Sequence, residues 1–557
     1  MKSYVIEGLL NLLIFIRMCL LRHISWKPFI IKTYNPREVQ NSVLEEILKQ
    51  NKDTVFGKKY DFIGINSYDD FRRKIPVHTY EDLRSYIERQ EETGEPHLTA
   101  EPTAMYALTS GTLGKPKYIP IHETMIRNFK KCQRLFSYAL YSEIPSTYSG
   151  KVLAITGPAV EGYSSGGVPF GSLSGLLYKE TPKFIKSKYI IPSAVFEIDN
   201  YDLKYFLICA IALSHKDITL IATANPSTIL KLSEVINLNL DKLIQIIETG
   251  SLNGVDEPST EKLKTIAGYF NRNAKRAREL DDLSKTREHI KLKDIWPNIQ
   301  TVVTWTSGSC SVLIPKLIEQ LPDLANIVEM GYFASEFRGS IVIDVLGNNA
   351  VPAFHENFYE FVERDDWQNT NPNFLTLDQI SEGRQYYILV TTPGGLYRYF
   401  INDIIEVTGT YNKTPMIKFV QKGKGVTNIT GEKLYECQLN QAIEAIKNEH
   451  NLDIDFFIMI ADPEALQYAL YIEHAPVSAI DIESEVEKKL FKLNIEYEGK
   501  RKSKRLKPLR LMFLKPGTGE AYKKACVKAG QREGQYKLLT LQYNKECKFN
   551  FEKHVYL

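Results

Sequence analysis

A nine-residue segment from Thr109 to Lys117, Thr-Ser-Gly-Thr-Leu-Gly-Lys-Pro-Lys, combines residues that could bind an anion. Glycines let the backbone turn sharply, so that several N–H groups can approach one anion. The hydroxyls of Thr109, Ser110 and Thr112 can donate hydrogen bonds to phosphate oxygens, and Lys117 adds a positive charge. The alternative is a polar turn between two strands, because Ser, Thr and Gly are common in turns.

The segment differs from the Walker phosphate loop. Lys115 follows Gly114, but Pro116 stands where the Walker pattern has Ser or Thr. Proline lacks an N–H donor and fixes its own φ, which favours an open turn over the first turn of a phosphate-capping helix. The order of two hydroxyls, Gly111, Thr112, Gly114 and then Pro-Lys resembles the ATP-phosphate loop of the adenylate-forming enzymes, the superfamily of acyl-CoA synthetases and luciferases.

Three short apolar runs between residues 301 and 345 each end in small or polar residues. Thr301–Trp305 is followed by Thr-Ser-Gly-Ser, and Ile327–Met330 is followed by Gly-Tyr-Phe-Ala-Ser-Glu. The third run, Ser340–Val345, ends at Gly347. Because ligands of α/β sheets bind beyond the carboxyl ends of the strands, we expect a binding site at these ends.

Three charged residues outside the loop each have a functional and an ordinary interpretation. Glu336 could hold Mg²⁺, a hard cation that takes oxygen ligands, or it could be a salt-bridged surface residue. Asp403 could accept hydrogen bonds from both hydroxyls of a ribose, or it could pair with Arg398. Lys537 could neutralise charge at a carboxylate that attacks ATP, or it could be one more solvated lysine.

Length and composition favour a soluble protein of more than one domain. A chain of 557 residues is too long for one hydrophobic core, and its 43% apolar and 25% charged residues are ordinary values. The net charge of +3 gives no indication of a nucleic-acid partner, and we expect the basic run 272–278 on a solvated helix face. The seven cysteines include no C-x-x-C pair, which favours reduced thiols and a cytoplasmic location.

Strands that alternate with helices predict an α/β fold class. We expect strands at 151–156, 218–223 and 385–392 and a helix at 126–141. The charged, glycine-rich connector 421–425 is interpreted as the domain boundary, which divides residues 1–420 from 421–557. Beyond it, the order helix-strand-strand-helix-strand predicts a small α+β domain, with a helix that begins near Asp481.

The N-terminus contains an apolar run, Leu9–Ile16, near the polar residues Glu7, Asn11 and Arg17. A membrane span needs about 20 apolar residues, so we expect no transmembrane segment. We interpret this stretch as a helix packed on the body of the protein. Attachment to a membrane surface is the alternative.

Together, these motifs resemble the Gretchen Hagen acyl acid–amido synthetases, the auxin-responsive promoter family, in a shorter form that looks bacterial. The matching motifs keep the family's order from about residue 36 to 540. They are the loop 109–117, Gly308-Ser309 after Trp305, Tyr332-x-Ala334-Ser335-Glu336, Gly395-Leu396-Tyr397-Arg398-Tyr399 with Asp403, Gly431-Glu432-Lys433, and Gln535-Tyr536-Lys537. Two positions depart from the pattern: Asn402 stands where glycine usually precedes the aspartate, and Lys422 stands where arginine is common in the hinge.

The resemblance implies a large multi-layer adenylation domain, a small mobile C-terminal domain, and ATP with Mg²⁺. It implies that a small carboxylic acid is adenylated with release of pyrophosphate and that the acyl group is then transferred to an amine, commonly an amino acid. It gives catalytic roles to Lys537 and Glu336, with Glu336 also on magnesium. It places the nucleotide against Thr109, Ser110, Gly111, Thr112, Gly114, Lys117, Gly308, Ser309, Tyr332, Ala334, Ser335, Asp403 and Lys422.

The resemblance also implies that the helix 126–141 helps to wall the acyl pocket. Its candidate pocket residues are Arg134, Phe136, Tyr138 and Tyr141. The sequence identifies neither the acyl substrate nor a general base for the amine, and we expect a monomer.

Other functions remain open at this point. An acyl-CoA ligase shares the first half-reaction, and a non-catalytic nucleotide-binding regulator would not need the acidic and basic residues that this chain retains. The segment Gly162–Gly166 fits the Gly-x-Ser-x-Gly nucleophile elbow of serine hydrolases, although the following Gly-Val-Pro is a poor start for a helix. His289 and Asp294 have an acyltransferase-like spacing, in a charged stretch that we interpret as a solvated helix.

Overall fold

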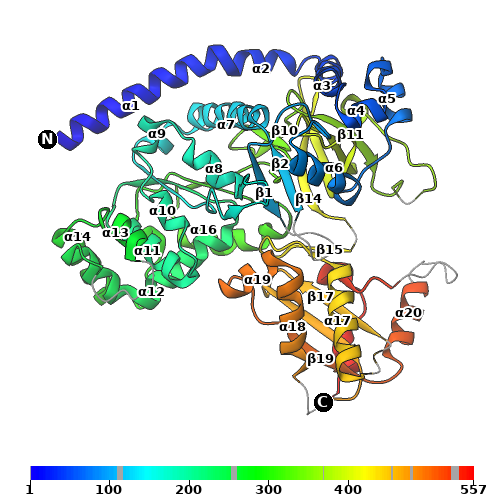
Figure 1. Cartoon of the computed structure of the whole chain (residues 1–557). Coiled ribbons are helices and arrows are strands. Elements are labelled where there is room, and N and C mark those ends of the chain that lie inside the picture. The colour runs from blue at the N-terminus through cyan, green and yellow to red at the C-terminus, as the bar shows by residue number, and fades with distance from the viewer. Residues whose placement is uncertain are drawn as a thin grey trace. The chain divides into compact units, whose positions relative to one another are not determined.

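The computed structural model describes residues 2–109, 117–252, 260–367, 369–423, 425–452, 454, 456–476, 481–528 and 538–556. The chain divides into two compact units. The larger contains residues 1–108, 118–308 and 314–421, and the smaller contains 109–117, 309–313 and 422–557. Both mix helices and strands, which confirms the α/β fold class with one large and one small part (Figure 1).

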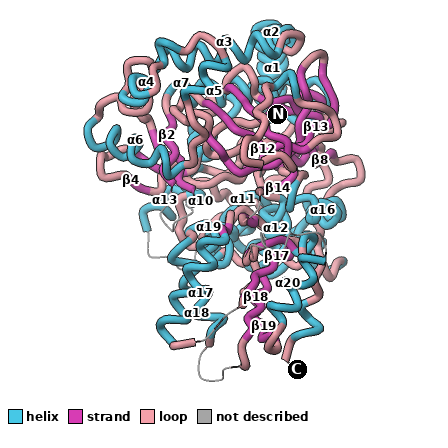
Figure 2. The backbone as a smooth tube through the Cα atoms, turned by 90° about the vertical axis from the view of Figure 1, so that its right-hand side faces the viewer, coloured by secondary structure: helices cyan, strands magenta, loops and turns pink. Residues whose placement is uncertain are grey.

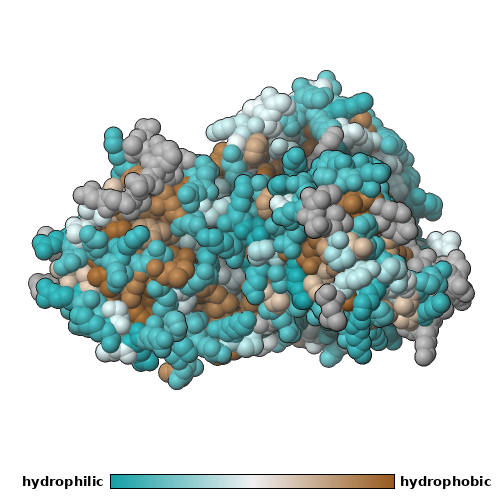
Figure 3. All heavy atoms as spheres, turned by 90° about the horizontal axis from the view of Figure 1, so that it is seen from below, coloured by the Kyte–Doolittle hydropathy of each residue, from teal (hydrophilic) through white to brown (hydrophobic). Residues whose placement is uncertain are grey.

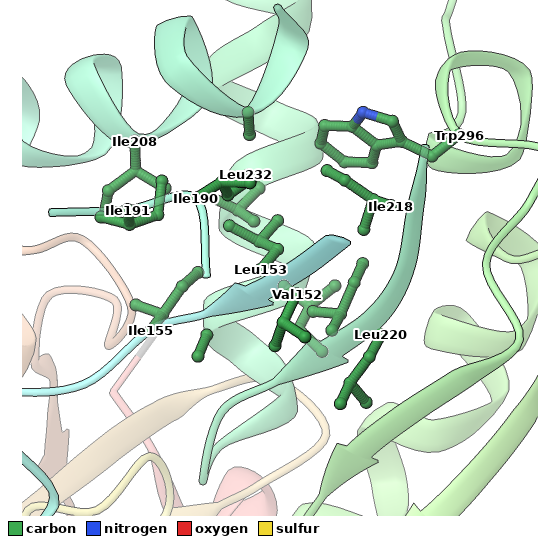
Figure 4. Packing of buried hydrophobic residues seen from close by; sticks show 14 of the residues in the cluster. Val152, Leu153, Ile155, Ile190, Ile191, Ile208, Ile218, Leu220, Leu232 and Trp296 are labelled. Carbon is green, nitrogen blue, oxygen red and sulfur yellow. The ribbon is translucent and has the colours of Figure 1, made fainter. Parts of the chain in front are cut away.

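A buried parallel sheet forms the first core of the larger unit. Its strands, in spatial order, are β3 (Lys151–Ala154), β6 (Ile218–Ala222), β7 (Thr301–Thr304) and β8 (Asn326–Glu329). All three neighbouring pairs are parallel. Figure 4 shows Val152 and Leu153 of β3 among side chains such as Ile208 and Leu232, which come from α11 (Tyr201–Leu213) and α12 (Pro226–Thr249). Such burial explains why the strands read as near-continuous apolar runs in the sequence.

The second core of the larger unit contains antiparallel strands. The four-stranded sheet has the order β11 (Phe358–Glu363), β12 (Gln385–Thr391), β13 (Tyr399–Tyr411) and β14 (Thr414–Lys422). The hairpin of β9 (Ser340–Asp344) and β10 (Asn349–Pro352) packs with the same core. A further sheet has the order β2 (Lys117–Ile121), β1 (Met105–Thr109), β5 (Pro169–Gly171) and β4 (Gly162–Tyr163).

The segment that fits a nucleophile elbow is a hairpin turn. β4 pairs with β5 in antiparallel register, and the Ser164 hydroxyl accepts a hydrogen bond from the Val168 N–H at 3.1 Å inside the turn. Helix α8 begins only at Leu173. The serine therefore lacks the strand–turn–helix setting that exposes a hydrolase nucleophile, and the hydrolase alternative is wrong.

Helices cover the sheets of the larger unit. Besides those already named, they are α3 (Pro36–Asn51), α4 (Val55–Lys59), α5 (Tyr68–Lys74), α6 (Tyr80–Thr93), α7 (Glu123–Glu143), α8 (Leu173–Lys179), α9 (Lys183–Lys186), α10 (Ser193–Phe196), α13 (Thr260–Ala267), α14 (Ala274–Thr286), α15 (Leu292–Ile295) and α16 (Ile314–Gln320). The space-filling view in Figure 3 shows hydrophilic residues over much of one face of the protein, with hydrophobic residues gathered in patches.

The structure corrects two expectations about surface helices. In the basic run, Arg272, Lys275 and Arg278 are exposed as expected, but Arg276 is 6% exposed, because its guanidinium donates to the carbonyls of Leu213 and Ile295. The stretch from His289 to Asp294 is not one solvated helix, since α14 ends at Thr286 and α15 begins at Leu292. Asp294 accepts from the Lys291 N–H at 2.9 Å and so caps α15.

The N-terminal helix is longer than the apolar run predicted. Residues 2–32 form α1 (Lys2–Leu21), a π-helical turn (Arg22–Trp26) and α2 (Lys27–Lys32) without a break. Ile14, Met18 and Leu21 are buried against Tyr138, Tyr141 and Tyr148. Packing on the body is therefore confirmed for one face. By length and composition, the segment Glu7–Lys32 could also cross a membrane.

The smaller unit is an α+β layer. Its elements are β15 (Val426–Thr427), β16 (Leu434–Tyr435), α17 (Glu436–His450), β17 (Phe457–Asp462), β18 (Gln467–Glu473), α18 (Ile482–Leu493), α19 (Ile495–Lys502), β19 (Arg510–Leu514), α20 (Thr518–Lys528) and β20 (Leu541–Tyr543). The sheet order is β19-β18-β17-β20. Alternate residues of β17 face different clusters: Met459 packs with the residues of α17 and α18, and Ile458 packs with Tyr522 of α20. In Figure 2, α17 and α18 lie on one side of these strands and α20 lies on the other.

We expect acid to destabilise the fold through His122, which precedes α7. This side chain is 1% exposed, and burial lowers the pKa of its imidazole to about 4. Between about pH 6.5, where histidine titrates in an unfolded chain, and pH 4, the unfolded state binds more protons than the folded one. The free energy of unfolding should therefore fall by about 3 kcal/mol as pH falls through this window.

His122→Gln tests this expectation. Glutamine does not titrate, so the drop in the thermal unfolding midpoint between pH 7.5 and pH 5 should shrink in this variant. Replacing the exposed His23 with glutamine should leave the drop unchanged. An equal drop in the wild type and in His122→Gln would show that other groups cause the acid sensitivity.

Candidate functional site

Glu329 joins the ends of two parallel strands in the larger unit. It is the last residue of β8, and one of its oxygens accepts hydrogen bonds from the Thr306 N–H at 2.8 Å and the Ser307 hydroxyl at 3.1 Å, both just beyond β7. Its other oxygen accepts from the Gly331 N–H at 2.9 Å. The carboxylate therefore fixes the two loops that leave the sheet at its carboxyl edge, where ligands of α/β sheets bind.

The position of Gly308 has no room for a side chain. Its φ is +62°, a conformation that L side chains rarely adopt. A Cβ atom there would lie 2.9 Å from the Phe419 ring and 3.2 Å from the Val420 carbonyl oxygen. The loop after β7 thus runs close against β14, and only glycine permits this approach.

Tyr332 and Asp403 form a buried pair. The Tyr332 hydroxyl donates to Asp403 Oδ2 at 2.5 Å, and these side chains are 8% and 2% exposed. The Tyr332 ring stacks on Phe419 with 5.6 Å between ring centroids, and Gly339 has no Cβ, which would lie only 2.1 Å from the ring. Burial, with the charge of Asp403 second, raises the pKa of the Tyr332 hydroxyl well above its usual value, so it stays a donor.

Glu336 lies near this pair. It is 3% exposed, in a turn closed by pairing between Phe333 and Arg338, and its charge contributes to the raised pKa of Tyr332. A surface salt bridge is therefore the wrong interpretation of Glu336. The structure brings two predicted functional carboxylates, Glu336 and Asp403, to one tyrosine.

The residues before Asp403 explain one departure from the family pattern. Asn402 has a φ of +60°, a left-handed conformation in which glycine is easiest and asparagine is the next best tolerated residue. Arg398 also has a positive φ, +46°, and it pairs with Glu360 rather than with Asp403. The ordinary interpretation of Asp403 as the partner of Arg398 is therefore wrong.

The remaining predicted nucleotide contacts are only partly visible. Thr109 ends β1, Lys117 is buried at the start of β2, Ala334 and Ser335 are half-buried in the turn before Glu336, and Lys422 is buried at the end of β14. The side chain of Ser309 and the residues Ser110, Gly111, Thr112, Gly114 and Lys537 lie outside the described residues. Their roles stay predictions.

The four candidates for the acyl pocket point in several directions from α7. Phe136 is buried in the core around the parallel sheet. Tyr138 and Tyr141 pack against the N-terminal helix, with the Tyr138 ring 5.1 Å from that of Trp26. Arg134 is exposed, and its charge acts on Arg17 of α1. The pocket assignment stays a prediction.

Sequence reasoning missed Glu329, Glu360 and Phe419. Glu329 had a visible signal, since an acidic residue inside the apolar run 327–330 needs hydrogen-bond donors when that run is buried. Glu360 had the same signal, as an acid within the strand Phe358–Glu363. Phe419 had no such signal, because its role in the site depends on contacts with residues that are distant in the sequence.

Comparison with known proteins identifies the family. Residues 27–325 match the GH3 family N-terminal domain, residues 350–422 the GH3 family central domain, and residues 437–546 the GH3 family C-terminal domain. The chain is 25% identical to indole-3-acetic acid-amido synthetase GH3.4 of Arabidopsis thaliana, over 91% of this chain and 89% of the relative. It is 23% identical to 4-substituted benzoates-glutamate ligase GH3.12 of the same plant, over 91% and 92% of the two chains.

Solved structures share the fold. The GH3.15 acyl acid amido synthetase has a TM-score of 0.66 at 23% identity, with 96% of each chain covered. The AtGH3.15 acyl acid amido synthetase in complex with 2,4-DB has a TM-score of 0.65 at 24% identity and covers 94% of this chain and 95% of its own. The first of the three domain matches alone covers more than half of the 557 residues. The chain therefore belongs to the GH3 family.

Proposed function

We propose that this protein is an ATP-dependent acyl acid–amido synthetase. It activates a carboxylic acid as its adenylate and then joins the acyl group to an amine, an amino acid by preference. The observation that carries the proposal is the buried Tyr332–Asp403 pair beside Glu336, in a chain whose length is spanned by the three GH3 domains. The curated relatives are named for the same kind of reaction.

The reaction has two steps. In the first, a carboxylate oxygen of the acid attacks the α-phosphorus of ATP, and the bond to the bridging oxygen breaks as pyrophosphate leaves. In the second, the amine nitrogen attacks the acyl carbon, AMP leaves with the electron pair of the C–O bond, and the nitrogen loses a proton. Most of the catalytic gain in such a reaction comes from positioning and from electrostatic stabilisation.

The chain's own residues fit these tasks. Asp403 is an acceptor for ribose hydroxyls, and Tyr332 holds one of its oxygens in place. The loop 109–117 provides N–H and hydroxyl donors to the phosphates, and the Lys537 ammonium offsets charge at the reacting phosphorus. Movement of residues 421–557 between the two steps would let Lys537 act in the first and withdraw for the second.

Glu336 fits a magnesium ion. Mg²⁺ binds proteins through one or two carboxylates plus substrate phosphates, and a carboxylate that is 3% exposed beside the predicted nucleotide residues matches that pattern. When bound, Mg²⁺ supplies positive charge to the phosphates and orients the leaving group.

The substrates are proposed from chemistry and from the relatives. Indole-3-acetic acid, 4-substituted benzoates and 2,4-DB appear in the names of the relatives, and glutamate appears as an amine. These compounds are the first to test. An acyl-CoA ligase is the second candidate, since it forms the same adenylate. The bacterial form of the family, a cytoplasmic location and a monomer stay predictions; the curated relatives named above come from plants.

The test is carboxylate-dependent ATP–pyrophosphate exchange. The wild-type chain should catalyse exchange with a member of the acid panel, and Lys537→Ala should lower the exchange rate at least about a hundredfold while ATP still binds. Lys545→Ala, at an exposed lysine nearby in the sequence, should keep full exchange. Amino acids, but not CoA, should then discharge the adenylate and release AMP.

A different experimental result would contradict each part of this proposal. Unimpaired exchange in Lys537→Ala would remove that lysine from the first step. Discharge by CoA alone would make the protein an acyl-CoA ligase. Tight ATP binding without exchange for any acid would favour the non-catalytic regulator.

A further inference from the structure

The N-terminal helix presents an apolar face that nothing in the described structure covers. Residues 2–32 are continuously helical, which gives a length of about 46 Å. Nineteen large hydrophobic side chains are exposed in the described part of the chain, and eight of them lie between Leu9 and Ile31. They are Leu9, Leu12, Leu13, Phe15, Ile16, Leu20, Ile24 and Ile31, each at least 41% exposed.

These side chains form a stripe along one side of the helix. Leu9, Leu13, Ile16, Leu20 and Ile24 recur at spacings of three or four residues, so they share one face. The opposite face carries Ile14, Met18 and Leu21, each 4% exposed against the tyrosines of α7 and the residues after it. Figure 1 shows α1 and α2 in blue running alongside α7. The helix is thus apolar on two sides, and only one side is used within the chain.

Positive charge accompanies the stripe. The first 32 residues contain five lysines and arginines, Lys2, Arg17, Arg22, Lys27 and Lys32, and one acid, Glu7. Their net charge of +4 compares with +3 for the whole chain, so the other 525 residues carry −1. Arg22 and Lys27 are exposed on the same helix as the stripe. An apolar face flanked by lysine and arginine matches a lipid surface that carries negative headgroups.

The helix is held to the body in a way that suits lying on a membrane rather than crossing it. Lys188 donates to Asn11 Oδ1 at 2.6 Å, and Lys151 lies 3.8 Å from Glu7. Trp26 packs on Tyr138 with 5.1 Å between ring centroids. If α1 crossed a bilayer, these contacts would break, and the buried face of α1 would lose its packing against α7. The match to the GH3 N-terminal domain begins only at residue 27, so most of the helix lies outside the part that the family match covers.

We propose that residues 2–32 dock the enzyme onto an anionic lipid surface, with the helix parallel to the membrane plane and the stripe from Leu9 to Ile31 facing the acyl chains. Lysine and arginine side chains beside the stripe contact the phosphate headgroups. The proposal is independent of the ligase activity, because no residue of the stripe belongs to the proposed nucleotide site.

Vesicle flotation of the full-length protein tests the docking. The wild type should float with vesicles of phosphatidylcholine and phosphatidylglycerol, should bind pure phosphatidylcholine more weakly, and should be released by high salt. The triple variant Leu13→Glu, Ile16→Glu, Leu20→Glu should bind the anionic vesicles at least about tenfold more weakly. Reversing charge in Arg22→Glu with Lys27→Glu should cost about fivefold for each positive charge removed.

A matched control separates the stripe from general hydrophobicity. Leu238, Ile318 and Leu324 are 73%, 58% and 90% exposed elsewhere on the larger unit. Changing all three to glutamate should leave vesicle binding as in the wild type. Both triple variants should keep the wild-type thermal unfolding midpoint and the wild-type rate of ATP–pyrophosphate exchange in the absence of lipid.

Four outcomes would overturn the proposal. The first is no flotation of the wild type with anionic vesicles, and the second is an equal loss in the control triple variant. The third is a concentration-dependent dimer that sedimentation detects in the wild type but not in the variant Leu13→Glu, Ile16→Glu, Leu20→Glu. Such a dimer would mean that a second copy of the chain covers the stripe. The fourth is membrane association that survives alkaline carbonate extraction, which would indicate a helix that spans the bilayer.

Discussion

Replacing Asp403 with alanine is expected to lower kcat/KM for ATP in the exchange reaction about a thousandfold, because two hydrogen bonds to a charged acceptor are lost. Asp403 is 2% exposed, and one of its oxygens is already held by the Tyr332 hydroxyl at 2.5 Å. A carboxylate fixed in this way costs little further ordering when it binds a ribose. The measurement is the exchange rate over a range of ATP concentrations.

Deoxynucleotides separate a ribose contact from a purely structural role. In the wild type, 2′-deoxy-ATP and 3′-deoxy-ATP should each react at least about tenfold more slowly than ATP. In Asp403→Ala, all three nucleotides should react equally, since their discriminating partner is absent. Tyr332→Phe, which keeps the ring stacked on Phe419, should retain the discrimination. A full deoxy effect that persists in Asp403→Ala would mean that Asp403 supports the site without touching the ribose.

Replacing Glu360 with glutamine is expected to lower the free energy of unfolding of the larger unit by about 3–5 kcal/mol, because it leaves a buried guanidinium without its counter-charge. Glu360 and Arg398 are 1% and 4% exposed at the side chain, with Arg398 Nε 2.8 Å from Glu360 Oε2. The Tyr68 hydroxyl donates to the same carboxylate at 3.0 Å. Urea unfolding, followed by tryptophan fluorescence, measures the change.

The same strand offers the control. Glu363 pairs with Arg384 at 2.8 Å, but these side chains are 41% and 65% exposed. Glu363→Gln should therefore change stability by less than about 0.5 kcal/mol. The double variant Glu360→Leu, Arg398→Met should lose less than Glu360→Gln alone, since no charge is left buried. If Glu360→Gln and Glu363→Gln lowered the free energy of unfolding equally, the buried pair would stabilise the fold no more than the exposed pair does.

Much of the fold follows from local sequence patterns. The apolar runs near 301, 327 and 340 are strands β7, β8 and β9, and the helix expected at 126–141 is α7 (Glu123–Glu143). Asn225 and Asp481 cap α12 and α18, as their side chains allow. These features depend on a few neighbouring residues, so one sequence suffices to predict them.

Features that depend on residues distant in the sequence were harder to predict. Arg276 of the basic run is buried because its guanidinium donates to the carbonyl of Leu213, 63 positions earlier in the chain. The stretch from His289 to Asp294 was misread for a local reason, because Asp294 caps a short helix that begins only at Leu292. The polar residues Glu7, Asn11 and Arg17 argued against a membrane span, and the structure adds that α1 continues through them, with Asn11 bonded to Lys188 and Glu7 paired with Lys151 on the body. A sequence pattern alone does not reveal such partners.

The candidate site also has some features that the sequence predicts and others that it does not. Residue types and order indicated Tyr332, Glu336 and Asp403, and the structure places the two carboxylates beside the tyrosine. The direct bond from Tyr332 to Asp403 joins residues 71 positions apart and could not be predicted from spacing. The positive φ of Asn402 turns an apparent departure from the family into a conservative exchange, since both glycine and asparagine accept that conformation.

The parallel sheet also constrains how the chain is made. Strands β3, β6 and β7 begin at residues 151, 218 and 301, so 67 further residues must be synthesised before β3 can pair with β6, and 83 before β6 can pair with β7. At ribosomal speeds of about 5–20 residues per second, an apolar strand edge stays unpaired for on the order of ten seconds on the nascent chain. Chaperone supply and codon choice between residues 151 and 301 should therefore govern the yield of this protein more than changes after residue 422.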